Sequence, residues 1–387
     1  MTTRSQHLLG LVVLGALVAA GACGDDDDKQ ADRSDDSSSP SEAAADAGPI
    51  VFSTEGNNLN AYTPDPPFEK QTVIRTVTDD PAGGMDINGQ ICFFPDDPHR
   101  FIAGEDTGQP ERTPGWGIFE VDGTAVGDLS AREVGRLVPT YQVDDANPEN
   151  YGCGVLTDGR VVTTDIGNQV TGDPTGQLIV WFPPFDSETV SYCKIDVAIP
   201  TAGGIVVDED DQIYVTTARP PDNGVLRYSG PYPTSDEAAG GCGRTDPTGA
   251  PLADAVDKAR FIPADDHAPT PNALIRAGED GGFYVSSAFT GTIAHYDRDG
   301  AYVETLLAPP QGETFGPTPY STGSPLGLAV LPDGTIYFAD LGLGLGDDGV
   351  GPLPKAGSVR RLVPGAAAPE VMDRELDYPD GIGLYYP

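Results

Sequence analysis

PLGLAVLPDGTIYFADLG, Pro325 to Gly342, is the clearest copy of a cassette that recurs along this chain. The cassette runs from a small residue through an apolar run, Asp-Gly and an aromatic or β-branched run to an acidic residue. Four related copies are YGCGVLTDGRVVTTDIG (Tyr151–Gly167), AGGIVVDEDDQIYVTTA (Ala202–Ala218), NALIRAGEDGGFYVSSA (Asn272–Ala288) and the looser ICFFPDDPHRFIAGED (Ile91–Asp106). Two short β-runs joined by Asp-Gly predict a hairpin. Repetition every ~50–70 residues predicts blades of one β domain rather than separate domains.

A sixth copy is divided between the two ends of the folded region. The chain ends in YPDGIGLYYP (Tyr378–Pro387), the first half of a cassette, and GPIVFSTEGNNLNAYTP (Gly48–Pro64) supplies a second half. Joining the two halves gives one complete blade. We therefore expect residues 49–387 to form an all-β, six-bladed β-propeller. Pairing of the C-terminal strand with N-terminal strands closes the ring and leaves only short, protected edges.

The first 48 residues predict export. Residues 1–22 resemble a signal peptide, with Arg4 before the apolar run Leu8–Gly21. AGAC (Ala20–Cys23) resembles a bacterial lipobox, which predicts lipidation of Cys23, although it also fits ordinary signal-peptide cleavage. Residues 23–48 contain no aromatic or large aliphatic side chain and predict a disordered acidic tether. We expect an exported lipoprotein at the cell surface or in the periplasm.

The charge of the chain limits its partners. The 387 residues include 60 Asp and Glu against 22 Lys and Arg, for a net charge of −38. Such a surface repels nucleic acid and anionic lipid. We expect membrane contact only through the lipid anchor, a monomer, and as partner a small-molecule ligand or a cell-surface protein. Cations are attracted, although solubility or adaptation to salt also explains the charge.

Cys23 apart, four cysteines remain in a chain predicted to be exported. An even number predicts two disulfides, for which three connectivities are possible. We expect Cys92 and Cys153 on the inner strands of neighbouring blades, and Cys193 and Cys242 in outer strands or loops of the next pair. That placement favours pairing Cys92 with Cys153 and Cys193 with Cys242.

Strand direction assigns the cassette's polar residues to the two faces of the ring. The Asp-Gly turns join the first strand of a blade to the second and need no chemical role. The opposite face, at one mouth of the central channel, gathers the starts of the first strands and the ends of the second. Oxygen ligands there suit a hard cation such as Ca²⁺. The predicted cation ligands are Asp380, Asn272, Asn150, Glu105, Asp165 and Asp340. The alternative is that the acids after the second strands bind backbone N–H groups of the following loops.

Three further residues are candidates for a site at this mouth. The long loops Glu105–Gly117 and Asp165–Gly176 place Trp116 and Asn168 as substrate-binding candidates. His267 precedes the first strand of the fifth blade and, with Asp380, is a candidate catalytic base. Packing between blades is the alternative for Trp116, and a surface position is the alternative for His267.

The cassette resembles the blades of NHL-repeat and gluconolactonase (senescence marker protein) propellers over residues 49–387. The resemblance implies one divalent cation, held by a Glu, two Asn and an Asp in a Pro-Asp-Gly setting. Asp380 matches that Asp, and Asn272 matches an Asn with Ala273 in place of Gly, but the Glu has no equivalent here. One hypothesis is a metal-dependent hydrolase of lactones or esters. The other is a non-catalytic propeller that binds a ligand or protein, and the fold does not choose between them.

Overall fold

The computed structural model describes residues 48–105, 114–140, 150–167, 174–186, 189–219, 223–277, 281–347 and 349–387. The predicted signal peptide, Cys23 and the tether up to residue 47 lie outside the described residues. Within the described ranges, no helix is long and apolar enough to cross a membrane.

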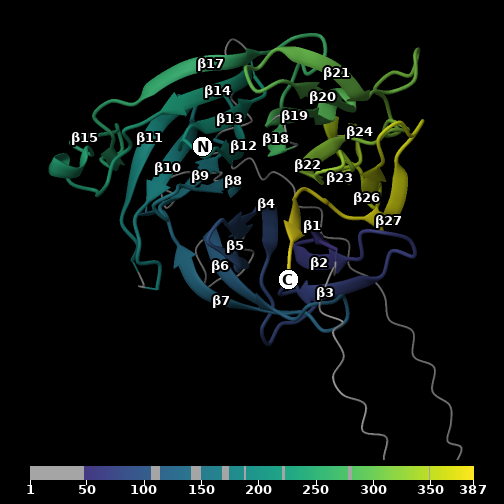
Figure 1. Cartoon of the computed structure of the whole chain (residues 1–387), viewed down its shortest axis with the longest axis horizontal. Coiled ribbons are helices and arrows are strands. Elements are labelled where there is room, and N and C mark those ends of the chain that lie inside the picture. The colour runs from purple at the N-terminus through teal and green to yellow at the C-terminus, as the bar shows by residue number, and fades with distance from the viewer. Residues whose placement is uncertain are drawn as a thin grey trace, which may run out of the picture. The chain divides into compact units, whose positions relative to one another are not determined.

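Six four-stranded antiparallel sheets form the blades of the ring (Figure 1). From the inner strand outward, blade 1 contains β28 (Ile382–Tyr385), β1 (Ile50–Glu55), β2 (Asn58–Tyr62) and β3 (Lys70–Ile74). Blade 2 contains β4 (Ile87–Phe94), β5 (Asp97–Glu105), β6 (Gly115–Asp122) and β7 (Ser130–Leu137). Blade 3 contains β8 (Asn150–Val155), β9 (Val161–Asp165), β10 (Gly176–Trp181) and β11 (Tyr192–Ile199). Blade 4 contains β12 (Ala202–Val207), β13 (Ile213–Thr217), β14 (Gly224–Ser229) and β17 (Asp257–Pro263). Blade 5 contains β18 (Ala273–Ala277), β19 (Gly282–Ser287), β20 (Thr292–Tyr296) and β21 (Tyr302–Leu307). Blade 6 contains β22 (Pro325–Val330), β23 (Ile336–Asp340), β26 (Gly357–Leu362) and β27 (Glu370–Leu376).

Short additional elements decorate the blades. They are the strands β15 (Arg244–Thr245) and β16 (Pro251–Leu252), the hairpin β24 (Leu343–Gly346) with β25 (Gly349–Pro352), and the 3₁₀ turns η2 (Ala238–Gly240) and η3 (Ala288–Thr290).

The ring closes as the two half-cassettes predict. The C-terminal strand β28 pairs antiparallel with β1, in a register from Ile50 opposite Tyr385 to Ser53 opposite Ile382. In Figure 1 the yellow C-terminal strand lies beside the purple β1. The buried Tyr385 hydroxyl donates to the Gly123 carbonyl at 2.9 Å and lies 2.8 Å from His99 Nδ1. These bonds hold the end of the chain on blade 2, so the six-bladed ring and its closure are confirmed.

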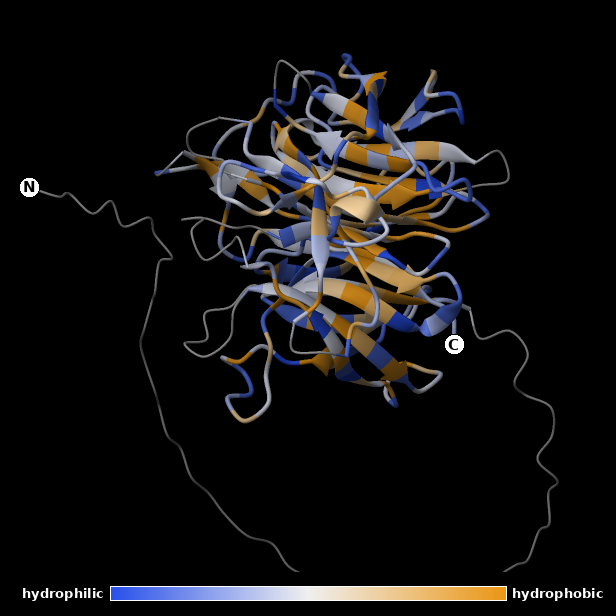
Figure 2. Ribbon diagram, turned by 90° about the vertical axis from the view of Figure 1, so that its left-hand side faces the viewer, coloured by the Kyte–Doolittle hydropathy of each residue, from blue (hydrophilic) through white to orange (hydrophobic). Residues whose placement is uncertain are grey.

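The hydrophobic core consists of separate layers between blades. Each of six buried clusters joins two neighbouring blades, for example Phe52 of blade 1 with Phe101 of blade 2, or Val51 of blade 1 with Tyr337 of blade 6. Figure 2 shows hydrophobic residues concentrated along the strands. Because every blade buries both faces, its strands read as nearly continuous apolar runs.

A hydroxyl group near the end of the second strand joins neighbouring blades beside the channel. Thr164 accepts a hydrogen bond from Gly152 N of its own blade at 2.8 Å and donates to Gly203 O of the next blade at 2.7 Å. The equivalent hydroxyls in three other blades also reach the next inner strand: Thr54 to Gly89 O, Thr216 to Asn272 O and Ser286 to Leu326 O. Gly104 and Ala339 occupy this position in blades 2 and 6.

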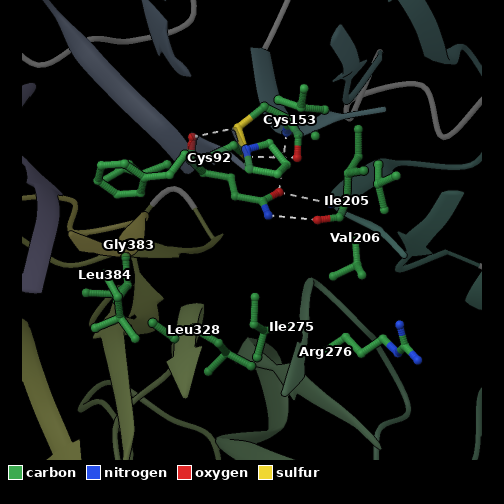
Figure 3. A pocket seen from close by; sticks show the side chains of 18 of the residues that line it. Cys92, Cys153, Ile205, Val206, Ile275, Arg276, Leu328, Gly383 and Leu384 are labelled. Atoms are coloured by element: carbon green, nitrogen blue, oxygen red, sulfur yellow. Dashed lines mark hydrogen bonds between the residues drawn. A yellow bond between two sulfur atoms is a disulfide. The ribbon is translucent and has the colours of Figure 1, made fainter. Parts of the chain in front are cut away.

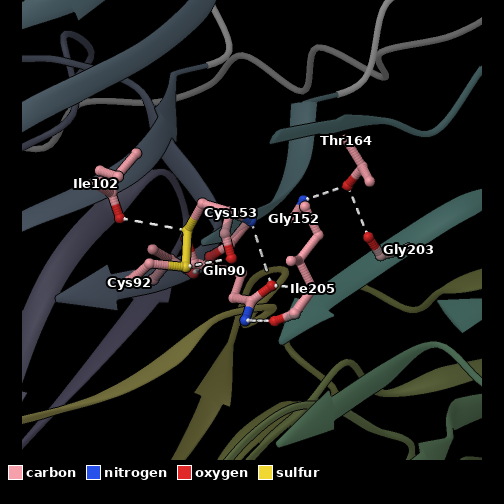
Figure 4. The surroundings of a disulfide bond; sticks show 10 residues. Gln90, Cys92, Ile102, Gly152, Cys153, Thr164, Gly203 and Ile205 are labelled. Atoms are coloured by element: carbon pink, nitrogen blue, oxygen red, sulfur yellow. Dashed lines mark hydrogen bonds between the residues drawn. A yellow bond between two sulfur atoms is a disulfide. The ribbon is translucent and has the colours of Figure 1, made fainter. Parts of the chain in front are cut away.

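Both expected disulfides are present. Cys92 on β4 and Cys153 on β8 join inner strands with Cα atoms 5.9 Å apart (Figure 4). Cys193 on β11 joins Cys242 with Cα atoms 6.1 Å apart, which fastens a loop of blade 4 onto blade 3. In the same loop β16 pairs with β11, and so extends the sheet of blade 3.

An ion pair lies beneath this added edge. Lys194 is 1 % exposed and its Nζ lies 2.5 Å from Oδ2 of Asp246, which is 8 % exposed. The Asp246 carboxylate also accepts hydrogen bonds from Thr248 and from Ala250 N. Burial alone would raise the pKa of Asp246, but the hydrogen bonds from Lys194 and Thr248 lower it below its usual value.

Replacing the hydroxyl that joins blades 3 and 4 will lower stability. Thr164→Val leaves the Gly152 N–H and the Gly203 carbonyl without their bond, at a cost of ~1–3 kcal/mol. Urea unfolding followed by fluorescence measures this loss. Thr234→Val, at an exposed threonine outside the blade interfaces, is the control and should change stability little. Equal losses in the two variants would contradict the role assigned to Thr164.

Removing one partner of this ion pair should lower the free energy of unfolding more than replacing both partners does. Asp246→Ala leaves the buried Lys194 ammonium without its carboxylate, and should destabilise the protein by ~3–5 kcal/mol. Lys194→Met combined with Asp246→Asn should recover part of that loss, because no buried charge remains. Thermal unfolding of the oxidised protein tests both variants. A double variant less stable than Asp246→Ala would show that the charges stabilise the loop by themselves.

Candidate functional site

Three of the predicted carboxylate ligands are buried in contacts within their own blades. Glu105, Asp165 and Asp340, at the ends of β5, β9 and β23, are each 0 % exposed. Glu105 forms an ion pair with Arg136, and Asp165 accepts a hydrogen bond from Gly167 N at 3.0 Å. These contacts match the alternative in which acids after the second strand hold the following loop.

Asp340 makes the most complete set of such contacts. Its carboxylate accepts hydrogen bonds from Ser324 N at 2.6 Å, Gly342 N at 3.1 Å and the Ser358 hydroxyl at 2.7 Å. Arg360 Nη2 lies 2.8 Å from Oδ2 and neutralises the charge. The carboxylate therefore holds together the start of β22 and the end of β23 in blade 6, and it is not exposed to the channel.

The two predicted asparagine ligands also bind backbone. Asn150, 7 % exposed, donates from Nδ2 to Gly115 O at 2.9 Å, and Asn272 Oδ1 accepts from Ala288 N at 2.9 Å. Among the residues that the structure describes, no three or more His, Cys, Asp or Glu side chains are grouped so that they could hold a metal ion. The six predicted ligands do not fit one cation site in this arrangement.

The remaining predicted site residues lie elsewhere. Trp116 is 0 % exposed and packs against Trp181, with ring centroids 6.0 Å apart, so it is interblade core and does not wall a pocket. Its large apolar ring is excluded from water between blades 2 and 3. The His267 ring stacks on Tyr302 of the outer strand β21 at 3.5 Å, which places it at the rim of blade 5. Asn168 lies outside the described residues.

Asp380 differs from the other predicted carboxylates because it is partly exposed, just before the innermost strand β28. Its Oδ1 accepts a hydrogen bond from the Thr54 hydroxyl, and its Oδ2 accepts one from Gly89 N at 3.0 Å. Burial raises the pKa of Asp380 to about 6, although the hydrogen bonds from Thr54 and Gly89 lower it. The group therefore changes charge close to physiological pH.

Tyr151 lies on the other side of the Asp380 backbone. Its hydroxyl donates to the Asp380 carbonyl oxygen at 3.4 Å. Burial, and then the negative charge of Asp380, raise the pKa of Tyr151 well above its usual value. Tyr151 therefore remains a neutral hydrogen-bond donor. Next to Gly89, the buried Asn88 Oδ1 has no hydrogen-bond partner in the described part of the chain.

Glycines bring the inner strands into backbone contact at this level of the channel. A Cβ at Gly381 would lie 1.8 Å from Gly89 O, and one at Gly327 would lie 2.5 Å from Asp380 O. Gly152 and Gly203 approach the next inner strand in the same way, since a Cβ at either would lie 2.5 Å from a carbonyl oxygen. We call Gly89, Gly152, Gly203, Gly327 and Gly381 the glycine waist. It explains the small residue at the start of each cassette.

Thr54 and Tyr151 were not predicted as site residues. Thr54 occupies the cassette position of the interblade hydroxyls, so the repeat itself carries the signal that places it beside the channel. Tyr151 opens its cassette in the position that follows a predicted ligand, Asn150. Nothing in the local sequence indicates that its hydroxyl reaches blade 1, because that contact depends on ring closure.

Comparison with known proteins shows the fold. No family model and no curated protein matches this chain. Among solved structures, the periplasmic gluconolactonase of Pseudomonas aeruginosa is 12% identical, with a TM-score of 0.51, over 87% of this chain and 99% of that one. The nidogen/laminin complex is 12% identical, with a TM-score of 0.50, over 88% and 99%. A calcium-binding regucalcin from Agrobacterium tumefaciens is 13% identical, with a TM-score of 0.46, over 86% and 87%.

The chain is thus a six-bladed β-propeller whose structural neighbours include a periplasmic gluconolactonase and a chain of the nidogen/laminin complex. At these identities the likeness is one of fold, and the chemistry must be argued from the residues at the channel.

Asp340 should affect stability and not cation binding. Asp340→Ala leaves Arg360 without its carboxylate and two buried N–H groups without their acceptor, and we expect a loss of ~3–5 kcal/mol in urea unfolding. Asp340→Asn keeps the shape and should lose less. Any rise in melting temperature with Ca²⁺ should be the same in Asp340→Asn as in the unsubstituted protein. Selective loss of a Ca²⁺ effect in this variant would restore Asp340 as a ligand.

Proposed function

We propose that this protein is an exported propeller, anchored through a lipid on Cys23, that binds a small molecule at the Asp380 end of its channel and hydrolyses a lactone or related ester there. The observation that carries the proposal is Asp380. Asp380 is a half-buried residue at the channel, and desolvation of its carboxylate raises its pKa to about 6. A general base works best when its pKa lies near the operating pH.

The residues around Asp380 can be assigned roles in this reaction. The ionised carboxylate takes a proton from water, and the water oxygen attacks the ester carbonyl carbon. The bond between that carbon and the ring oxygen then breaks, and Asp380 returns the proton to the leaving oxygen, which gives a hydroxy acid.

No step is assigned to a metal ion, because the five predicted ligands other than Asp380 bind groups within the protein. Thr54 acts on Asp380 as a positioning residue. Its hydroxyl accepts from Gly381 N at 2.8 Å and donates to the Asp380 carboxylate, so it orients that carboxylate and favours its charged form.

The two disulfides support export. Disulfides persist in oxidising compartments, and both expected bonds form here. An acidic segment after an acylated cysteine would place the propeller at the membrane surface without inserting it.

A second candidate is a non-catalytic propeller that binds a small molecule or a surface protein. The burial of Glu105, Asp165 and Asp340 favours this candidate. Because these three carboxylates bind groups within their blades, Asp380 is the one predicted carboxylate left to contact a ligand, and binding alone requires no more than that. In this case a ligand would bind at Asp380 without turnover.

Hydrolysis should follow the ionisation of Asp380. Because the base must be deprotonated, the rate should rise with pH, reach half its maximum near pH 6 and level off above pH 7. Asp380→Asn should abolish the rate while the protein stays folded. A screen of lactones and carboxylate esters, with proton release followed at fixed pH, makes the measurement.

Thr54→Val tests whether Thr54 positions the Asp380 carboxylate or only contributes to the stability of the fold. Loss of its hydrogen bond should raise the pKa of Asp380 and move the half-maximal pH upward. Thr164→Val removes the equivalent hydroxyl in blade 3 and should leave this midpoint unchanged. An activity that survives Asp380→Asn, or no turnover of any ester by the intact protein, would favour the second candidate.

A further inference from the structure

A cavity lies on the other side of the glycine waist from Asp380. It has a volume of about 460 Å³ and is lined by all six inner strands. Its lining begins one residue beyond the waist, at Gln90 on β4 and Ile382 on β28, and none of the five waist glycines takes part. We call this cavity the channel chamber. It opens toward the face of the Asp-Gly turns, where the sequence predicted only structural roles.

Most residues that line the chamber are hydrophobic, and backbone groups and a few polar side chains complete the lining. Figure 3 shows side chains from several inner strands around a common space, among them Ile275, Leu328 and Leu384. Ile275 and Leu384 keep part of their surface exposed inside the ring. The disulfide between Cys92 and Cys153 forms part of the wall and fixes the spacing of β4 and β8.

One polar side chain lies at the inner end of the chamber and is already paired. Gln90 Nε2 donates to Ile205 O at 2.8 Å, and its Oε1 accepts from Ile205 N at 2.9 Å (Figure 4). The amide therefore pairs with the backbone of β12, two blades away, as a neighbouring strand would. This pairing satisfies the N–H and C=O groups of Ile205, which would otherwise make the inner end of the chamber polar.

The charges at the outer rim are also paired with each other. Arg276 forms an ion pair with Glu209, whose side chain is 69% exposed, and donates from Nε to Gly281 O at 3.0 Å. Asp208 accepts hydrogen bonds from the Tyr214 hydroxyl at 3.0 Å and from Gln212 N at 2.8 Å. The Arg276 guanidinium faces the carboxylates of both Glu209 and Asp208, so the rim offers a ligand no free positive charge.

We infer that the channel chamber is a second binding site, for a largely hydrophobic small molecule that carries no negative charge. Its volume falls in the range of small-molecule pockets, and burial of apolar surface supplies the binding free energy. An anionic ligand would lose its hydration and find no positive charge that is free. The site is independent of the Asp380 mouth, from which the glycine waist separates it.

The test uses N-phenyl-1-naphthylamine, an uncharged hydrophobic dye that fluoresces when it leaves water. The oxidised, full-length protein should bind the dye saturably with a stoichiometry of one. Ile275→Trp fills the chamber and Ile275→Gln makes it polar, and each should weaken binding by about tenfold or more, the equivalent of ~1.4 kcal/mol. Val303→Trp, on the exposed outer strand of the same blade, is the matched control and should bind as the unsubstituted protein does.

Two outcomes would overturn the inference. One is the absence of saturable binding by the unsubstituted protein, and the other is equal binding by Ile275→Trp and Val303→Trp when both have native circular dichroism and melting temperature. Asp380→Asn should bind the dye normally, and Ile275→Trp should keep any esterase activity. Loss of dye binding in Asp380→Asn would show one shared site instead of two. Failure of the hydrolase proposal alone would leave the dye results unchanged.

Discussion

Contact between neighbouring inner strands is the constraint on which the rest of this structure depends. Each inner strand must come within backbone distance of the next, which requires a glycine at its start in five of the six blades. Hydroxyls such as Thr164 then join a blade to the following carbonyl. The same contacts set the width of the channel, fix the level of Asp380 and determine where a cavity can begin.

Repetition made the fold predictable, because the cassette marks two strands and a turn in every blade. The divided copy at the chain ends was sufficient to predict closure of blade 1, and the positions of the cysteines in that ring predicted both disulfides. The site was less accessible to the same reasoning. Spacing placed Asp340 and Asp380 on one face, but it carried no information about burial. Asp340 turned inward to Ser324 and Arg360, while Asp380 remained partly exposed.

Trp116 and Tyr151 illustrate the limit in another way. A tryptophan after a long loop fits a pocket wall and an interblade core equally well, and only packing against Trp181 decides between them. The contact of Tyr151 with Asp380 joins residues far apart in the chain, so no local pattern could predict it. The chamber beyond the waist was missed because strand direction drew attention to the acidic mouth, whereas branched aliphatic residues in inner strands read as ordinary core.

The position of β28 has a consequence for how the protein reaches its folded state. The innermost strand of blade 1 follows the other strands of the domain in the chain, while its partner β1 precedes them. Blade 1 is therefore complete only when these two distant segments have met, and until then β1 has an unpaired strand edge. Contacts between such distant segments form slowly. Closure of the ring is thus a late step in folding, before which the exposed edge of β1 is open to capture by a chaperone or by another chain.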